Sequence, residues 1–156
     1  PVDAHIPEKY VPEERLRLEA YKRLASVVSE DDIPAVIAEL TDRYGPLPSP
    51  VDTPVEVARV RILGRRADVG EIVLAGSRIR LSPVALPDSR IMRLTRLYPG
   101  TQIRPATRTI LVPRPTTAKV GGKSLVNREL LTWVEELLRS VIVGSNQTAT
   151  GSANEQ

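Results

Sequence analysis

The chain has 156 residues, a formal net charge of +3, no cysteine and a single histidine. Its length is enough for one ordinary domain, and the lack of cysteine excludes disulfides, a thiolate nucleophile and zinc sites of the finger kind. One histidine, His5, cannot build a metal cage. No apolar run approaches the roughly 18 residues of a membrane span. We therefore expect a cytoplasmic protein, or a piece of one, with no metal, no cofactor and no membrane contact.

The charge is unevenly distributed along the chain. Residues 1–70 carry a net charge of −3, whereas residues 71–143 carry +7. A basic half of this kind raises the possibility of nucleic acid or another acidic partner, because neutralising phosphates requires lysine and arginine. Aromatic residues make up only 3% of the chain, which argues against a surface that stacks on single-stranded bases.

The first half of the chain predicts three helices. Residues 1–12 contain three prolines and should form an extended lead-in. The first helix should begin at Glu13 and bury a wide stripe, the second should be capped by Ser29 and end at Gly45, and the third should cover 54–68. The side chains expected in the wide stripe are Leu16, Ala20, Leu24 and Val27, flanked by Leu18, Tyr21, Ala25 and Val28.

The second half has a strand-like pattern. Residues 71–75 and 78–82 predict a hairpin around Gly76, a short helix should follow Asp88, and 101–104 and 108–112 should be two more strands. A last helix, capped by Ser124, should run to about residue 143. We therefore expect an α+β fold with three N-terminal helices, a small, mainly antiparallel sheet and a C-terminal helix. Its expected organisation is a lead-in over 1–12, a single domain over 13–143 and a disordered polar tail over 144–156.

The segment from Gly121 to Ser124 ends like a phosphate-binding loop. In such a loop an early glycine turns amides toward phosphate, but the corresponding position here is Thr117, and two prolines stiffen the approach. The simpler interpretation is a loop that leads into a helix. Because no pair of carboxylates and no histidine in a fixed setting stands out either, we do not expect the chain itself to be an enzyme.

Two groups of charged residues are candidates for binding. Glu39, Asp42 and Arg43 fall on one exposed arc of the second helix, away from its apolar stripe, and could be solvated or could dock on a partner that carries arginines. Arginines cluster on the expected third helix and recur through the β-rich half, where a solvated surface is the plain interpretation and phosphate binding is the alternative. The candidates for phosphate binding are Arg59, Arg65, Arg66, Arg90, Arg93 and Arg96.

The charged face of the second helix also carries a family resemblance. The segment ELTDRYGPLP at residues 39–48, preceded by RLRLEAYKRLA at 15–25, resembles the C-terminal domain of bacterial transcription-repair coupling factor (Mfd). The similarity is strong through about Asp68 and weaker in the β-rich half. The combination of these two segments is fairly specific.

The resemblance implies a regulatory rather than a catalytic role. In that family the parent is an ATP-dependent DNA translocase that dislodges stalled RNA polymerase and recruits excision-repair proteins, with its ATPase motifs upstream. The terminal domain would dock on the parent's own N-terminal UvrB-like module and mask the surface that binds UvrA. The family's docking residues match Glu39, Asp42 and Arg43. We expect a monomer whose partners are that module directly, and UvrA, RNA polymerase and DNA only through the parent.

Overall fold

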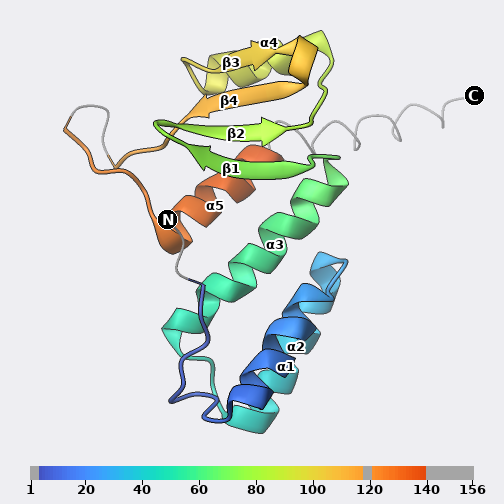
Figure 1. Ribbon diagram of the computed structural model, residues 1–156, viewed down its shortest axis with the longest axis vertical. Helices are drawn as coiled ribbons and strands as arrows, with labels where there is room; N and C mark the ends of the chain where they lie inside the picture. The colour runs from blue at the N-terminus through green and yellow to red at the C-terminus, as the bar shows by residue number, and fades with distance from the viewer. Residues whose placement is uncertain (1–3, 118–120, 140–156) are drawn as a thin grey trace, which may run out of the picture. The chain divides into compact units, whose positions relative to one another are not determined.

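The computed structural model describes residues 4–117 and 121–139, and the chain divides into two compact units. Unit 1 takes in Pro1–Ile62 and Val126–Thr132, and unit 2 takes in Leu63–Leu125 and Trp133–Gln156. Two helices, α3 (Asp52–Arg66) and α5 (Asn127–Leu137), contribute residues to both units (Figure 1).

Unit 1 is built from helices. It holds α1 (Glu14–Ala25), α2 (Ile33–Tyr44) and the first part of α3, with the short 3₁₀ turns η1 (Glu30–Asp32) and η2 (Ser49–Val51). Pro34 lies in the first turn of α2, where its missing amide costs no helical hydrogen bond. Gly45 ends α2 at a φ of 87°, which lies in the left-handed region that a residue without Cβ adopts without strain. Proline and glycine thus set the two ends of α2.

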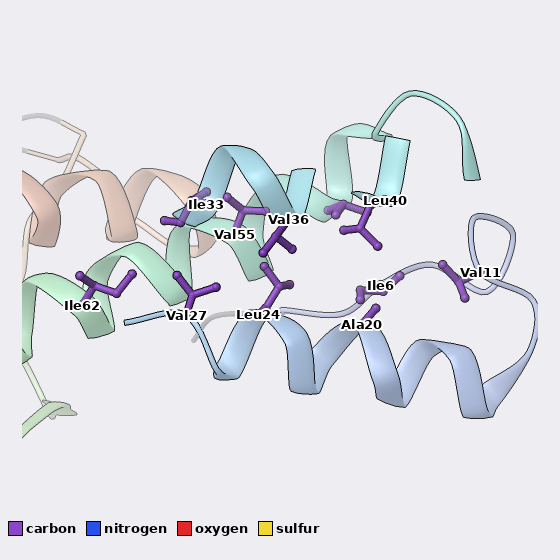
Figure 2. Close-up of a cluster of buried hydrophobic side chains, with 11 residues drawn as sticks. Ile6, Val11, Ala20, Leu24, Val27, Ile33, Val36, Leu40, Val55 and Ile62 are labelled. Atoms are coloured by element: carbon purple, nitrogen blue, oxygen red, sulfur yellow. The ribbon is translucent and has the colours of Figure 1, made fainter. Parts of the chain in front are cut away.

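The helices of unit 1 enclose an aliphatic core (Figure 2). Ile6 and Val11 of the lead-in belong to this core, and Arg17 of α1 donates hydrogen bonds to the carbonyls of Val11 and Pro12, both at 2.9 Å. The lead-in is therefore packed against the helices that follow it. The buried side chains of this core are Ile6, Val11, Ala20, Leu24, Val27, Ile33, Val36, Leu40, Val51, Val55 and Ile62.

Unit 2 contains a four-stranded antiparallel sheet. Its strands are β1 (Glu71–Ala75), β2 (Arg78–Ser82), β3 (Gln102–Arg104) and β4 (Thr109–Pro113), in the spatial order β1-β2-β4-β3. The helix α4 (Asp88–Leu97) and the turn η3 (Pro105–Thr107) lie between β2 and β4 in the chain. The ring of Tyr98 meets that of Trp133 edge to face at 5.3 Å. Within unit 2, residues 133–137 of α5 therefore pack near the end of α4.

The sheet has one buried and one open face. Residues opposite each other in an antiparallel pair point to the same side, so the register places Ile79 beside Val112 and Leu81 beside Ile110 on the buried side. The neighbouring positions Arg78, Arg80 and Arg104 then fall on the other side. This pattern confirms the half-buried hairpin predicted around Gly76.

The α+β class is confirmed, but three local predictions are wrong. The buried stripe of α1 is narrow, because Leu18 is 53% exposed and the helix ends at Ala25, before Val28, which is 69% exposed. The hydroxyl of Ser29 accepts a hydrogen bond from the Asp31 amide at 3.3 Å, so it caps η1 and not an α-helix. The last helix begins at Asn127, since Ser124 forms an isolated β-bridge with Thr116. The predicted end of that helix near residue 143 and the polar tail lie outside the described residues.

Candidate functional site

The three charged residues predicted on α2 share its exposed surface. Glu39, Asp42 and Arg43 are all exposed, whereas Val36 and Leu40 of the same helix are buried. The helical repeat of 3.6 residues produces this division, because the apolar residues recur three and four positions apart. The structure therefore places the three candidates on one accessible strip, called here the α2 face.

Glu39 is held by an arginine of the neighbouring helix. Nε and Nη2 of Arg23 donate to the two carboxylate oxygens of Glu39 at 3.1 and 3.0 Å, which is the forked arrangement that fits a guanidinium to a carboxylate. Both side chains stay open to solvent, at 41% and 52% exposure. The pair fixes the direction of the Glu39 carboxylate and ties α1 to α2. Because it is solvated, its main effect is on orientation and not on stability.

The ion pair also shifts the protonation of Glu39. The hydrogen bonds from Arg23 lower the pKa of Glu39, and the positive charges of Arg23 and Arg43 act in the same direction, while partial desolvation acts against them. The same hydrogen bonds raise the pKa of Arg23. Glu39 therefore remains a carboxylate at neutral pH, and the pair is lost only as the pH falls through this lowered value.

The C-terminal end of α2 is anchored by two tyrosines. The hydroxyl of Tyr10 donates to the carbonyls of Gly45 at 2.8 Å and Leu40 at 3.2 Å, and its ring meets Tyr44 edge to face at 5.8 Å. Burial, and then the neighbouring Tyr44, raise the pKa of Tyr10, so its hydroxyl keeps the proton that it donates. The guanidinium of Arg43 lies 5.4 Å from the centre of the Tyr44 ring. Tyr10 of the lead-in thus packs against Tyr44, and the ring of Tyr44 in turn contacts the guanidinium of Arg43.

A groove of about 430 Å³ runs beside the α2 face, between α1 and α2. Its floor is partly apolar, through Leu16, Ala20 and Leu40, and charged side chains stand along its margins. Such a combination is suited to a protein partner that inserts a side chain between charged contacts. The charged residues that line the groove are Glu19, Lys22, Arg23, Glu39 and Arg43.

Sequence reasoning did not identify Arg23 or Tyr10 as part of this site. Arg23 is separated from Glu39 by 16 residues and Tyr10 from Gly45 by 35, so neither contact follows from the period of a single helix. The only signal in the sequence was opposite charge on two consecutive helices. That signal becomes specific only when the packing of α1 on α2 is known.

The arginines proposed to bind nucleic acid differ in exposure and in ion pairing. Arg59 is half-buried and bonded to Glu56 at 2.5 Å, with Glu30 at 3.8 Å, so its charge is already engaged. Arg65 and Arg66 are exposed at the end of α3. On α4, Arg93 and Arg96 are exposed and Arg90 is half-buried. Arg59 is thus poorly placed to bind phosphate, and for the others the assignment stays a prediction.

Two residues of the segment that resembles a phosphate-binding loop, Thr117 and Lys123, are hydrogen-bonded to each other. The backbone amide of Lys123 donates to the hydroxyl of Thr117 at 3.1 Å, and the amide of Thr117 donates to the carbonyl of Lys123 at 2.9 Å. A phosphate-binding loop needs such amides to be directed at the ligand. The loop therefore agrees better with a turn that leads toward α5.

None of the described helices is long and apolar enough to cross a membrane.

We expect the Glu39 pKa, measured by carboxyl-detected NMR titration of the 156-residue chain, to lie below that of an exposed glutamate. Arg23→Ala should bring it back toward the ordinary value, since the main cause of the shift is removed. Lys22→Ala, next to Arg23 on α1, is the matched control and should leave the titration unchanged. An equal pKa in the parent chain and the Arg23 variant would show that the forked pair is absent in solution.

The fold is that of a domain already seen in a solved structure. A crystal structure of the C-terminal domain of transcription-repair coupling factor superposes with a TM-score of 0.67 at 16% identity, covering 92% of this chain and 91% of that one. This likeness supports the α+β fold of the chain. Sequence comparison identifies the family.

The chain belongs to the TRCF domain family, whose model matches residues 1–94. It is 41% identical over 155 residues to the transcription-repair-coupling factor of Mycobacterium tuberculosis, which covers 99% of this chain and 12% of that protein. The Escherichia coli protein of the same name is 39% identical over 56 residues, or 36% of this chain and 5% of its own length. These matches confirm the resemblance drawn from residues 15–48. The chain spans about an eighth of the mycobacterial relatives.

Proposed function

We propose that this chain is a non-catalytic, autoinhibitory interaction domain of a transcription-repair coupling factor. It docks through the α2 face on the N-terminal UvrB-like module of the same protein and masks the surface that binds UvrA. Membership of the TRCF family supports the assignment of the chain to a transcription-repair coupling factor. The observation that carries the proposal is the exposed strip of Glu39, Asp42 and Arg43, two carboxylates and a guanidinium on one rigid helix.

The charges on this face suit a reversible contact. Asp42 has no ion-pair partner among the described residues and is exposed, so its carboxylate can accept a guanidinium of the module. Glu39 is already oriented by Arg23, which lowers the conformational entropy lost when a partner binds it. Exposed pairs of this kind are screened by salt. A contact that depends on them can hold the domain in place and still be released.

The proposed setting follows from the role of the parent. The parent is an ATP-dependent DNA translocase of the cytoplasm in transcription-coupled nucleotide excision repair, and its ATPase motifs lie outside this chain. UvrA, RNA polymerase and DNA are reached through the parent, and the domain acts as a monomer without a cofactor. Release of the α2 face would couple engagement of a stalled polymerase to recruitment of UvrA.

Charge reversal on the α2 face tests this proposal. We expect the 156-residue chain to bind the separate N-terminal module in a salt-sensitive complex, and the double variant Glu39→Arg with Asp42→Arg to bind about tenfold or more weakly, because it places like charges together. Isothermal titration calorimetry gives the affinities. Glu8→Arg, an exposed glutamate of the lead-in with no ion pair among the described residues, makes the same type of charge change away from α2 and should bind normally.

The full-length protein supplies the functional readout. The same double variant should increase UvrA binding and basal ATPase activity, whereas the Glu8 variant should match the parent. If the double variant binds the module as the parent does and changes neither UvrA binding nor ATPase activity, docking through the α2 face is refuted.

A further inference from the structure

The open face of the sheet in unit 2 carries a cluster of positive charge. The register places Arg80 between Val73 and Leu111, and Arg104 opposite Thr109. Arg78 lies two residues from Arg80 on β2 and so projects from the same side. Three guanidinium groups from two strands therefore surround one area of this face.

A hollow of about 570 Å³ lies within this area. The half-buried side chain of Leu111 contributes an apolar floor, Thr109 lies beside it, and all three arginines take part in the lining. The hydroxyl of Thr109 is bonded to Ser82 and to the Thr107 carbonyl, both at 3.2 Å, so this side of the hollow is fixed. The hollow thus combines a firm apolar floor with a cationic margin.

The positive charge of this face is weakly compensated. Arg80 approaches Glu71 at 3.9 Å, beyond hydrogen-bonding distance, and Glu71 is 64% exposed. Arg78 and Arg104 form no ion pair with any described residue. Guanidinium groups that lack an internal partner are available for bidentate contacts with carboxylates.

The spacing and the apolar floor favour a peptide over a nucleic acid. Arg78 and Arg80 are about 6.6 Å apart along the strand, which equals the repeat of alternate side chains in an extended chain. Carboxylates at alternate positions of a peptide can therefore face them, while an aliphatic side chain at the next alternate position, which points the same way, covers Leu111. The strand positions on this face contain no aromatic residue on which a base could stack, and a phosphate backbone would gain nothing from the apolar floor.

We propose that the open face of this sheet is a binding site for an acidic polypeptide segment that also supplies an aliphatic side chain. Arg78, Arg80 and Arg104 bind the carboxylates, and the hollow over Leu111 receives the aliphatic group. This site belongs to unit 2 and involves no residue of the α2 face, so it is a second interaction surface of the domain.

The test uses the 156-residue chain and a short fluorescein-labelled peptide in which two aspartates and a leucine occupy successive alternate positions, with serine between them, so that all three side chains point to one side. We expect saturable binding by fluorescence anisotropy, and an affinity reduced about tenfold or more in the double variant Arg78→Glu with Arg104→Glu. The matched control is Arg93→Glu with Arg96→Glu, which makes the same charge change on α4 and should bind as the parent does. Circular dichroism of each variant confirms that the fold is retained.

Replacing Leu111 separates a specific site from general attraction between charges. Leu111→Ser should weaken binding of the aspartate-leucine peptide but not of the same peptide with serine in place of its leucine. Labelled duplex DNA at the same ionic strength tests the nucleic-acid alternative. No peptide binding, equal loss in the Arg78/Arg104 and Arg93/Arg96 variants, or DNA binding that is tighter than peptide binding and lost in the Arg78/Arg104 variant would each overturn the proposal.

Discussion

Replacing Ile33 by alanine should lower the free energy of unfolding of unit 1 by about 2–5 kcal/mol. Ile33 is the first residue of α2, is fully buried, and lies in the same core as Val36 and Leu24. Alanine would remove its outer carbon atoms and leave a space that the surrounding helices cannot fill completely. Urea denaturation followed by far-ultraviolet circular dichroism measures the effect.

A surface position provides the control for this experiment. Val28 is close to Ile33 in the sequence but 69% exposed, so Val28→Ala should change stability by no more than about 0.5 kcal/mol. The single tryptophan, Trp133, belongs to unit 2, and its fluorescence follows that unit separately. If the Ile33 and Val28 variants unfold at the same urea concentration, the core described for unit 1 is incorrect.

Two glycines of unit 2 should respond to the same substitution with opposite signs. A Cβ at Gly70 would overlap the ring of Pro83, and the Gly70 amide is bonded to the Pro83 carbonyl at 3.1 Å, so the backbone has little room to withdraw. Gly70→Ala should therefore destabilise unit 2 by about 1–3 kcal/mol. At Gly64 in α3, a Cβ would lie 3.8 Å from Ile72, an ordinary contact. Gly64→Ala should stabilise the helix by about 0.4–1 kcal/mol.

Trp133 fluorescence during urea denaturation measures both variants in one assay. The Gly64 variant is the matched control, because it adds the same methyl group in the same unit. A shift to higher urea for both variants, or no shift for Gly70→Ala, would contradict the close approach of residue 70 to Pro83.

The elements of the fold followed from local patterns, and the errors arose where distant contacts decide. The hairpin around Gly76 and the end of α2 at Gly45 depend on neighbouring residues, so the sequence predicted both. Ser124 has the chemistry of a helix cap, but its pairing with Thr116 delays the start of α5. Leu18 continues the apolar pattern of α1 and is exposed. No local rule shows which side of a helix its neighbours will cover.

The candidate site was predictable in position but not in detail. The arc formed by Glu39, Asp42 and Arg43 follows from helical geometry, and the structure confirms that all three are exposed. Their docking role stays a prediction. The forked pair with Arg23 and the groove beside it require the packing of two helices, which the sequence does not specify. The open arginine face of the sheet likewise depends on strand order. Arg80 of β2 and Arg104 of β3 lie on either side of β4, and the sequence does not specify this arrangement.

The forked contact between Arg23 and Glu39 limits how these two positions can evolve. Lysine at position 23 would preserve the charge but lose the second hydrogen bond, and aspartate at position 39 would shorten the reach between helices. A single change at either site therefore alters the orientation of the remaining side chain before any partner binds. Neutral drift at the two positions should therefore be coupled, because a change at residue 39 of α2 also alters its contact with α1.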